Sequence, residues 1–498
     1  MNKFGYYKTM TTIEQLYQHY LQHPLISTDT RKIPTGSMFF ALKGEKFDAN
    51  TFAQQAIEAG AAFAVIDNPD YKFNDQCLLV TDVLTTLQDL ARHHRRQLTI
   101  PVIGLTGTNG KTTTKELINA VLSQHFTTLA TRGNLNNHIG VPLTILSINA
   151  SHQMAVIEMG ANHIKEIGLL CSIAQPTHGL ITNVGKAHLE GFGSVEGVKI
   201  AKGELYDWLA PNGVAFINSG NPILTEMAEK RKFTVPPVFY GDAIDDLVSG
   251  EITENAPLLS LQWTNNSSGE SYNVKTQLTG AYNLDNILAA ISTGVYFKLS
   301  PQQINAGIEG YQPKNNRSQI VKTATNTLIC DYYNANPSSM MVAIDNIGKI
   351  TADRKVLILG DMFEMGAEAA TEHAAVMQKA LDTPVDERIF IGHEFEKAYG
   401  YEPSTAGYCL CYRRGCYYRF KSQPDKEFDD IDQRLARHGV GAVGRVALNY
   451  TRLSYIQCKR GLRYEDQNQK GDGRSSIAFL IWLLLIIRLQ YLANRFAD

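Results

Sequence analysis

Short apolar runs alternate with amphipathic stretches along most of the chain. In the opening region, residues 38–42 and 63–66 are apolar enough for strands. Residues 52–57 and 84–91 repeat apolar side chains at helical spacing, and the second stretch ends in a basic run at 92–96. We therefore predict a small α/β domain over residues 1–98.

From residue 99 the pattern changes to longer apolar strands separated by helical stretches. Residues 101–103, 154–158, 180–183 and 214–218 are typical of central parallel strands. Residues 257–279 alternate apolar and polar positions around a turn at 265–269, which predicts an antiparallel hairpin at the sheet edge, and a helix is expected at 284–297. The pattern predicts a doubly wound domain over residues 99–318.

A third α/β unit is predicted over residues 319–400. Its strands are expected at 327–331, 355–360 and 388–392, with helices after Pro337 and Gly366. Beyond residue 400 no period can be recognised, and four of the seven cysteines lie in this last part. Our hypothesis is that the reading frame shifts near residues 398–405, so that residues 401–498 are an out-of-frame tail and the third domain lacks its last strands.

The length of the chain and its charge balance limit the classes of protein to which it can belong. A chain of 498 residues exceeds one ordinary core, and 47 basic against 49 acidic side chains indicate neither a nucleic-acid surface nor a polybasic membrane patch. The apolar run at 477–487 is short of the roughly 20 residues that a bilayer span requires. Residues 1–12 lack the apolar core of a secretory signal and no C-x-x-C pair occurs, so we expect a cytoplasmic protein without membrane insertion.

Residues 103–115 carry the clearest chemistry, in the order I-G-L-T-G-T-N-G-K-T-T-T-K. Glycines at 107 and 110 let backbone N–H groups face phosphate oxygens, and a helix opening at Thr112 adds its positive dipole end. Lys111 would neutralise phosphates, and Thr112 would hold Mg²⁺. A glycine turn with a solvated lysine is the simpler alternative, but the preceding strand and the following helix favour a nucleotide triphosphate.

Further polar residues follow the neighbouring strands. Glu158 ends the strand after the P-loop, and His188, Lys199 and Lys202 follow the next one. In an open α/β sheet ligands bind at the carboxyl ends of the strands, so Glu158 is a natural Mg²⁺ ligand rather than a solvated glutamate.

Longer motifs add a resemblance. Residues 131–144 read T-R-G-N-L-N-N-H-I-G-V-P-L-T, residues 186–194 K-A-H-L-E-G-F-G-S, residues 331–337 D-Y-Y-N-A-N-P and residues 359–362 L-G-D-M. On these motifs residues 27–392 resemble the Mur ligase family, ATP-dependent enzymes that add amino acids to UDP-N-acetylmuramic acid. The resemblance implies a central P-loop ATPase domain between a small N-terminal α/β domain and a Rossmann-like C-terminal one. The family's closing Lys-Gly-Ser-Arg stretch is not found, and residues 470–475 are a faint echo of it.

The resemblance also assigns roles to single residues. It implies that the catalytic residues are Lys111, Lys202, His188 and Arg317, and that Thr112 with Glu158 and His188 with Lys202 hold two Mg²⁺ ions. Lys202 would be carbamylated (N6-carboxylated) by CO₂, with Lys199 the competitor by position. ATP would contact Gly107, Thr108, Asn109, Gly110, Lys111, Thr112, Thr113, Asn283, Asn286, Arg317 and Asp331. The substrate would contact Thr30, Arg31, Lys43, Asn134, Asn136 and Asn137.

Several of these roles have simpler alternatives. Lys202 could be a solvated helix residue, Arg317 a surface arginine in a linker, and Arg31 and Lys43 parts of charged surface loops. Tyr282 stands where the family usually has a histidine.

The activity implied by the resemblance is a ligation through an acyl phosphate. The substrates would be UDP-N-acetylmuramoyl-tripeptide, D-alanyl-D-alanine and ATP. The enzyme would be a monomer that acts in peptidoglycan synthesis. The Asp-Asn-Pro-Arg motif expected of the ligase that adds the third residue is not found. The alternatives are another Mur-type amino-acid ligase, a folylpolyglutamate synthetase, or a non-catalytic ATP-binding protein.

Overall fold

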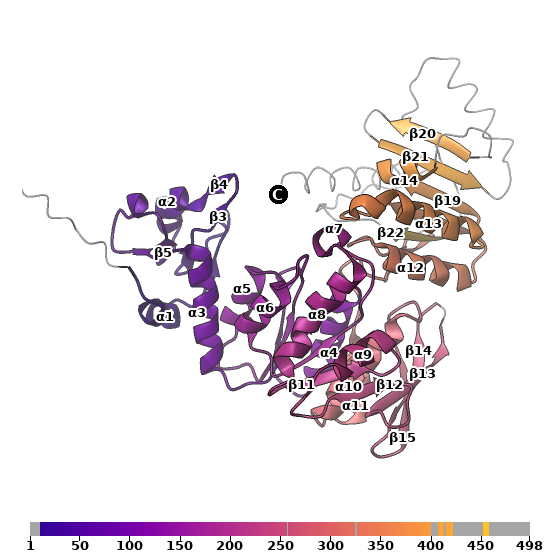
Figure 1. Cartoon of the computed structure of the whole chain (residues 1–498), viewed down its shortest axis with the longest axis horizontal. Coiled ribbons are helices and arrows are strands. Elements are labelled where there is room, and N and C mark those ends of the chain that lie inside the picture. The colour runs from indigo at the N-terminus through magenta and orange to yellow at the C-terminus, as the bar shows by residue number, and fades with distance from the viewer. Residues whose placement is uncertain are drawn as a thin grey trace, which may run out of the picture.

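The structure is a computed structural model that describes residues 10–255, 257–323, 326–399, 407–412, 415–421 and 452–457. Three α/β domains follow one another along the chain, coloured from indigo through magenta to orange in Figure 1. The predicted fold class is confirmed.

The N-terminal domain is a parallel sheet of order β1-β2-β5-β6 with helices packed on it. Its long last helix carries Leu87 and Leu90 at full burial and contacts the central domain through α5 and α6. Its elements are α1 (Ile13–Gln22), β1 (Ile26–Ser27), β2 (Met38–Phe40), β3 (Lys43–Gly44), β4 (Phe47–Asp48), η1 (Ala49–Phe52), α2 (Ala53–Glu58), β5 (Phe63–Ile66), η2 (Pro69–Tyr71), β6 (Cys77–Leu79) and α3 (Val83–Gln97).

The central domain contains a nine-stranded sheet of order β15-β14-β13-β12-β11-β10-β7-β9-β8. Strands β8 to β13 pair in parallel, whereas β14 and β15 form the hairpin predicted at the sheet edge. The elements are β7 (Val102–Thr106), α4 (Lys111–Leu122), β8 (Thr128–Ala130), α5 (Gly140–Leu146), β9 (Met154–Glu158), α6 (Glu166–Ala174), β10 (His178–Ile181), α7 (Leu189–Phe192), α8 (Val195–Leu209), β11 (Val214–Asn218), α9 (Pro222–Glu229), β12 (Val238–Gly241), β13 (Val248–Glu254), β14 (Ser260–Asn265), β15 (Glu270–Lys275), α10 (Asn283–Tyr296) and α11 (Pro301–Gly310).

The middle of this sheet is buried on both faces. Every residue of β7, β9 and β11 is buried, because helices cover each side. Continuous apolar runs are the expected pattern for such strands. The buried middle strands therefore form a rigid platform, and their carboxyl ends open toward the P-loop.

The third domain has a sheet of order β16-β17-β22-β18-β19-β21-β20. Strand β22 pairs in parallel with β17 and β18, whereas β21 and β20 extend the far edge in antiparallel fashion. The elements are β16 (Gln319–Lys322), β17 (Asn326–Cys330), α12 (Pro337–Lys349), β18 (Lys355–Gly360), η3 (Gly366–Glu368), α13 (Ala369–Asp382), β19 (Glu387–Ile391), α14 (His393–Tyr399), β20 (Gly407–Tyr412), β21 (Gly415–Lys421) and β22 (Arg452–Gln457).

Three strands, β20, β21 and β22, come from the region after residue 400, where no period was recognised, and they pair with the sheet of the third domain. The apolar run at 477–487 lies outside the described residues. Within the part of the chain that the structure describes, no helix has the length and apolar character to cross a bilayer.

Candidate functional site

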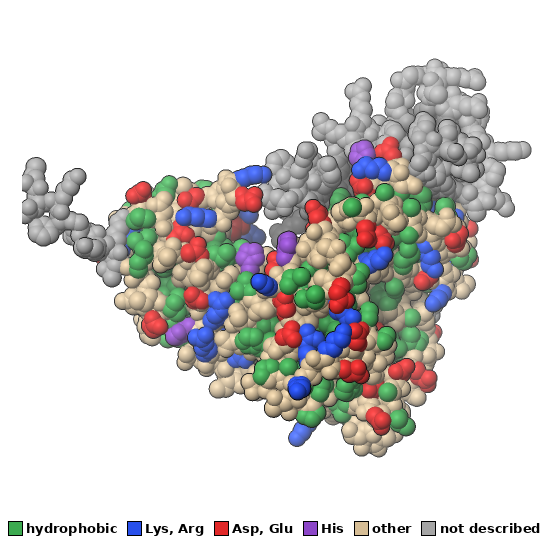
Figure 2. Space-filling view, viewed as in Figure 1, with side chains coloured by type: hydrophobic (Ala, Val, Ile, Leu, Met, Phe, Trp, Pro, Cys, Tyr) green, Lys and Arg blue, Asp and Glu red, His purple; other side chains and the backbone are tan. Residues whose placement is uncertain are grey.

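A cavity of about 850 Å³ lies at the carboxyl ends of the central strands, where the central and third domains meet. The space-filling view shows that the surface of the molecule is also recessed beside the N-terminal domain, with histidine side chains at the rim (Figure 2). Residues predicted for the site that line the cavity are Thr108, Asn109, Gly110, Lys111, Thr113, Asn134, Asn136, Asn137, Glu158, His188, Asn283, Asn286, Arg317 and Asp331.

The P-loop joins β7 to α4 with the backbone that phosphate binding requires. Gly107 and Gly110 have φ values of +147° and +79°, and a Cβ at Gly110 would lie 2.5 Å from the side-chain oxygen of Asn286. Lys111 Nζ donates to the carbonyls of Gly107 at 2.7 Å and Thr108 at 3.0 Å. Burial lowers the pKa of Lys111 to about 8, and the charge of Glu158 opposes this shift. The lysine is therefore held at the mouth of its own loop.

Thr112 and Glu158 meet behind this loop. Thr112 Oγ1 donates to Glu158 Oε1 at 3.2 Å, and Asn136 Nδ2 donates to the same oxygen at 2.9 Å. Glu158 is buried, and its Oε2 makes no hydrogen bond within the described part of the chain. A hydroxyl beside a buried, incompletely bonded carboxylate is a suitable hard-oxygen donor set for Mg²⁺.

His188 lies in a tight turn before α7, with a left-handed φ of +50°. Its Nδ1 contacts the carboxylate of Glu364 from the third domain, and such a contact leaves Nε2 for another partner. The residue that follows His188 packs on the third domain, since the side chain of Leu189 joins the apolar core of that domain. The geometry of His188 thus depends on how the two domains meet.

Lys202 is buried on α8 outside the lining of the cavity. Its Nζ donates to the carbonyl of Ala161 at 3.3 Å and lies 5.1 Å from the centre of the Phe192 ring. Burial, followed by the nearby charge of Lys111, lowers the pKa of Lys202 to about 7. The competitor Lys199 instead forms an ion pair of 2.9 Å with Glu226. Of the two lysines, Lys202 has the environment of a reactive amine.

The described residues contain no group of three His, Cys, Asp or Glu side chains placed to hold a metal.

Asn283 and Asn286, which were predicted to contact ATP, lie at the start of α10. Asn286 Nδ2 donates to Asn283 Oδ1 at 3.0 Å, and Thr114 Oγ1 donates to Asn286 Oδ1 at 2.9 Å. The hydroxyl of Tyr282, at the position where a histidine was expected, lies 2.5 Å from Ser318 Oγ. The start of α10 is thereby tied to the P-loop helix and to the link between the two domains.

Arg317 stands in the link between the central and third domains. Its guanidinium lies 3.8 Å from the centre of the Tyr333 ring, and both residues line the cavity. The arginine is therefore half-buried at the cavity rather than fully solvated.

Other contacts across the domain boundary were not predicted. Asn336 Nδ2 donates to Asn109 Oδ1 at 2.7 Å, and Lys186 Nζ donates to Glu372 Oε1 at 2.6 Å. The motif at 331–337 already contained Asn336, and Glu364 follows the motif at 359–362 by two positions. These two motifs could have indicated that Asn336 and Glu364 lie near the site.

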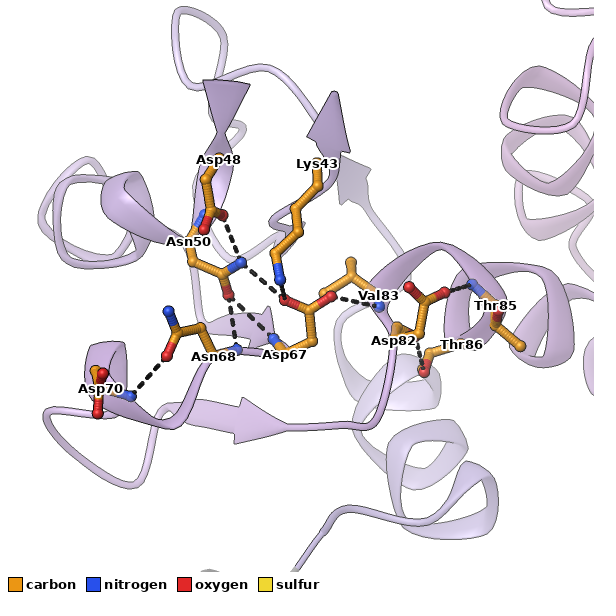
Figure 3. Close-up of polar contacts among 10 residues, drawn as sticks. All are labelled: Lys43, Asp48, Asn50, Asp67, Asn68, Asp70, Asp82, Val83, Thr85 and Thr86. Atoms are coloured by element: carbon orange, nitrogen blue, oxygen red, sulfur yellow. Dashed lines mark hydrogen bonds and ion pairs between the residues drawn. The ribbon is translucent and has the colours of Figure 1, made fainter. Parts of the chain in front are cut away.

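The N-terminal residues predicted for substrate lie elsewhere. Thr30, Arg31 and Lys43 are not among the described residues that line the cavity. The exposed Arg31 pairs with Asp29 at 2.9 Å, as a surface loop would. Lys43 forms an ion pair of 2.8 Å with the buried Asp67, which also accepts from Asn50 and the Val83 backbone (Figure 3). The structure does not join these three residues to the other predicted site residues.

The fold and the cavity define a three-domain protein of the P-loop nucleotide-binding class. Family models match residues 24–95 (Mur ligase family, catalytic domain), 105–294 (Mur ligase middle domain) and 316–403 (Mur ligase, glutamate ligase domain). The chain belongs to the Mur ligase family.

Curated relatives are similar over most of their length. The UDP-N-acetylmuramoyl-tripeptide–D-alanyl-D-alanine ligase of Bacillus subtilis is 36% identical over 353 residues, which cover 70% of this chain and 75% of that protein. The ligase of the same name from Escherichia coli is 36% identical over 376 residues, covering 74% and 81%.

Solved structures agree with the domain arrangement. MurF from Acinetobacter baumannii superposes with a TM-score of 0.72 at 28% identity, covering 90% of this chain and 95% of that one. MurF ligase from Thermotoga maritima in complex with ADP has a TM-score of 0.70 at 22% identity, covering 88% and 94%, which supports the fold.

Proposed function

We propose that this chain is an ATP-dependent ligase that joins D-alanyl-D-alanine to UDP-N-acetylmuramoyl-tripeptide in peptidoglycan synthesis. One observation carries the proposal: a single cavity gathers the P-loop, Glu158, Arg317 and the asparagines of the motif at 131–144. The 36% identity to two ligases of that name favours this acceptor over those of the other family members. Because ATP and nucleotide-linked precursors are cytoplasmic, we place the reaction in the cytoplasm.

The first chemical step would join two anions. A carboxylate oxygen of the peptide attacks the γ-phosphorus of ATP, ADP leaves, and an acyl phosphate forms. The amine of D-alanyl-D-alanine then attacks the acyl carbon, phosphate leaves, and the nitrogen loses a proton. Lys111 and Arg317 supply the positive charge that draws phosphate and carboxylate together and orients the transfer in line.

Two Mg²⁺ ions would share this electrostatic task. Thr112 and Glu158 would hold the first ion, and His188 with Lys202 the second. Bound Mg²⁺ would neutralise phosphate charge. The contact between His188 and Glu364 fits the second site, because a carboxylate on Nδ1 fixes the ring that presents Nε2.

Lys202 can serve as a metal ligand in the carbamylated form. A free ammonium would repel a cation, whereas a carbamate presents carboxylate-like oxygens. Carbamylation joins the neutral amine to CO₂ and releases one proton. The burial of Lys202, which favours the neutral amine, supports this assignment.

The acceptor can be identified by direct competition. With ATP, Mg²⁺ and the tripeptide nucleotide present, we expect D-alanyl-D-alanine to raise the rate of ADP formation at least about tenfold. Meso-diaminopimelate, lysine and glutamate should leave the rate at the background value. Coupled measurement of ADP checks this. A response to one of those amino acids instead would identify another member of the family, and ATP binding without a response to any acceptor would support a non-catalytic nucleotide-binding protein.

We propose separately that residues 401–498 are an out-of-frame translation. The family model for the third domain ends at residue 403, which supports this. The pairing of β20, β21 and β22 with the sheet of the third domain is the observation that counts against it. Sequencing the coding DNA should reveal a single insertion or deletion near codons 398–405, with a family-like third domain encoded in another frame. An uninterrupted frame through this region would contradict the proposal.

A further inference from the structure

A second lysine of α4 lies behind Glu158 and has no role in the proposed mechanism. Lys115 stands three positions after Thr112, on the same side of the helix, and its side chain is 0% exposed. A buried ammonium strongly destabilises a fold unless each of its donors is paired. The partners of Lys115 therefore indicate what the residue does.

Three oxygens surround the ammonium. Lys115 Nζ donates to the carbonyl of Thr131 at 2.6 Å and forms an ion pair of 2.9 Å with Glu116. It also lies 3.8 Å from Glu158 Oε2, the oxygen that makes no hydrogen bond within the described residues. Lys115 thus connects the P-loop helix, the end of β9 and the residue that follows β8.

The residue after β8 begins the motif at 131–144, whose asparagines line the cavity. Thr131 Oγ1 accepts from the backbone N–H of Glu158 at 2.9 Å. Asn136, five residues later, donates to Glu158 Oε1 at 2.9 Å and accepts from the N–H of Gly160 at 2.8 Å. A shift of this loop would therefore move the Glu158 carboxylate.

We propose that Lys115 is a positioning residue that holds Glu158 and the loop at 131–136 in one fixed arrangement. The ammonium secures Oε2 from behind, so that Oε1 keeps its place beside Thr112. The lysine thereby couples the metal and nucleotide end of the site to the loop expected to contact the muramoyl substrate. This inference rests on the proposed function for the identity of that substrate.

Lys115→Met tests the inference because methionine keeps an unbranched side chain of similar length but removes the charge. We expect the Mg²⁺ concentration needed for binding of a non-hydrolysable ATP analogue to rise about tenfold, as is typical when the partner of a metal ligand is lost. Titration calorimetry over a series of Mg²⁺ concentrations measures this without turnover. If Lys115 acted only as a nearby positive charge, its removal would lower the Mg²⁺ requirement, and that result would overturn the inference.

Two further variants separate positioning from packing. Glu116→Gln removes an ion pair of the same ammonium on the partly exposed side and should leave the Mg²⁺ requirement unchanged. Thr131→Val removes the hydrogen bond to the Glu158 N–H and should raise the requirement even where Lys115→Met does not fold. A lower thermal midpoint with an unchanged Mg²⁺ requirement in both Lys115→Met and Thr131→Val would show a purely structural role and reject the proposal.

The binding experiment with the ATP analogue distinguishes a failure of the Lys115 proposal from a failure of the proposed ligase activity. Binding needs only the nucleotide analogue and Mg²⁺, so it reports on Lys115 even if the wild-type chain shows no acceptor-dependent turnover. Absent turnover with a normal Lys115 response would count against the proposed ligase activity alone. A wild-type chain that does not bind the analogue with Mg²⁺ would overturn both.

Discussion

Replacement of Lys111 by alanine should abolish ATP-dependent phosphate release, with a loss of at least about a thousandfold. The reason is that Lys111 is the cation of the P-loop, half-buried at the mouth of the loop and hydrogen-bonded to its carbonyls. In water-poor surroundings its charge acts on phosphate with little screening. Phosphate release at saturating ATP, tripeptide nucleotide and D-alanyl-D-alanine measures the effect.

A lysine on the surface provides the matched control. Lys230 is largely exposed and pairs with Glu226 at 2.5 Å, away from the cavity. Lys230→Ala should retain wild-type turnover, and both variants should unfold at similar temperatures. Undiminished turnover of Lys111→Ala would reject the P-loop assignment.

The parts of the site that could be predicted from the sequence depend on local patterns. An apolar strand, two glycines and a helix start place Lys111 and Thr112 through backbone geometry alone. Glu158 could be added because parallel strands of one sheet end at the same edge. The antiparallel hairpin followed from the alternation of apolar and polar positions around a turn, and β14 and β15 confirm it.

Contacts between segments that are distant in the sequence could not be predicted from local sequence patterns. The pair Asn109 and Asn336 is separated by 227 positions, and no periodicity relates the two residues. Lys115 illustrates the same limit: a charged residue on an amphipathic helix reads as solvated, and its burial follows only from the packing of β8 and β9 over α4. Likewise, β22 lies between β17 and β18, although both strands come much earlier in the chain, and this insertion depends on tertiary pairing.

The N-terminal residues form ion pairs that the sequence pattern did not indicate. The resemblance implies that Arg31 and Lys43 contact the substrate, and in the structure each of them pairs with a carboxylate. For Lys43 the partner Asp67 is buried, and this ion pair raises the pKa of the lysine. A substrate role for either residue therefore requires that a phosphate compete with an existing ion pair, which a sequence pattern cannot reveal.

Lys202→Ala should lower turnover by about a hundredfold or more, because a ligand of the second metal would be lost. If the lysine acts as a carbamate, a small carboxylic acid such as acetate or formate can enter the space left by the side chain and present the missing oxygens. We expect added acetate to restore part of the activity in a saturable manner. Initial rates over a concentration series measure the recovery.

The neighbouring lysine shows whether the recovery is specific. Lys199→Ala removes ion pairs to Glu196 and Glu226 and should show neither the loss nor any response to acetate. Mass spectrometry under CO₂ should show an added mass of about 44 Da on the wild-type chain that is absent from Lys202→Ala, since carbamylation adds one CO₂ to a neutral amine. Failure of every short acid to restore activity, together with an unmodified wild-type lysine, would mean that the buried amine serves the site without becoming a carbamate.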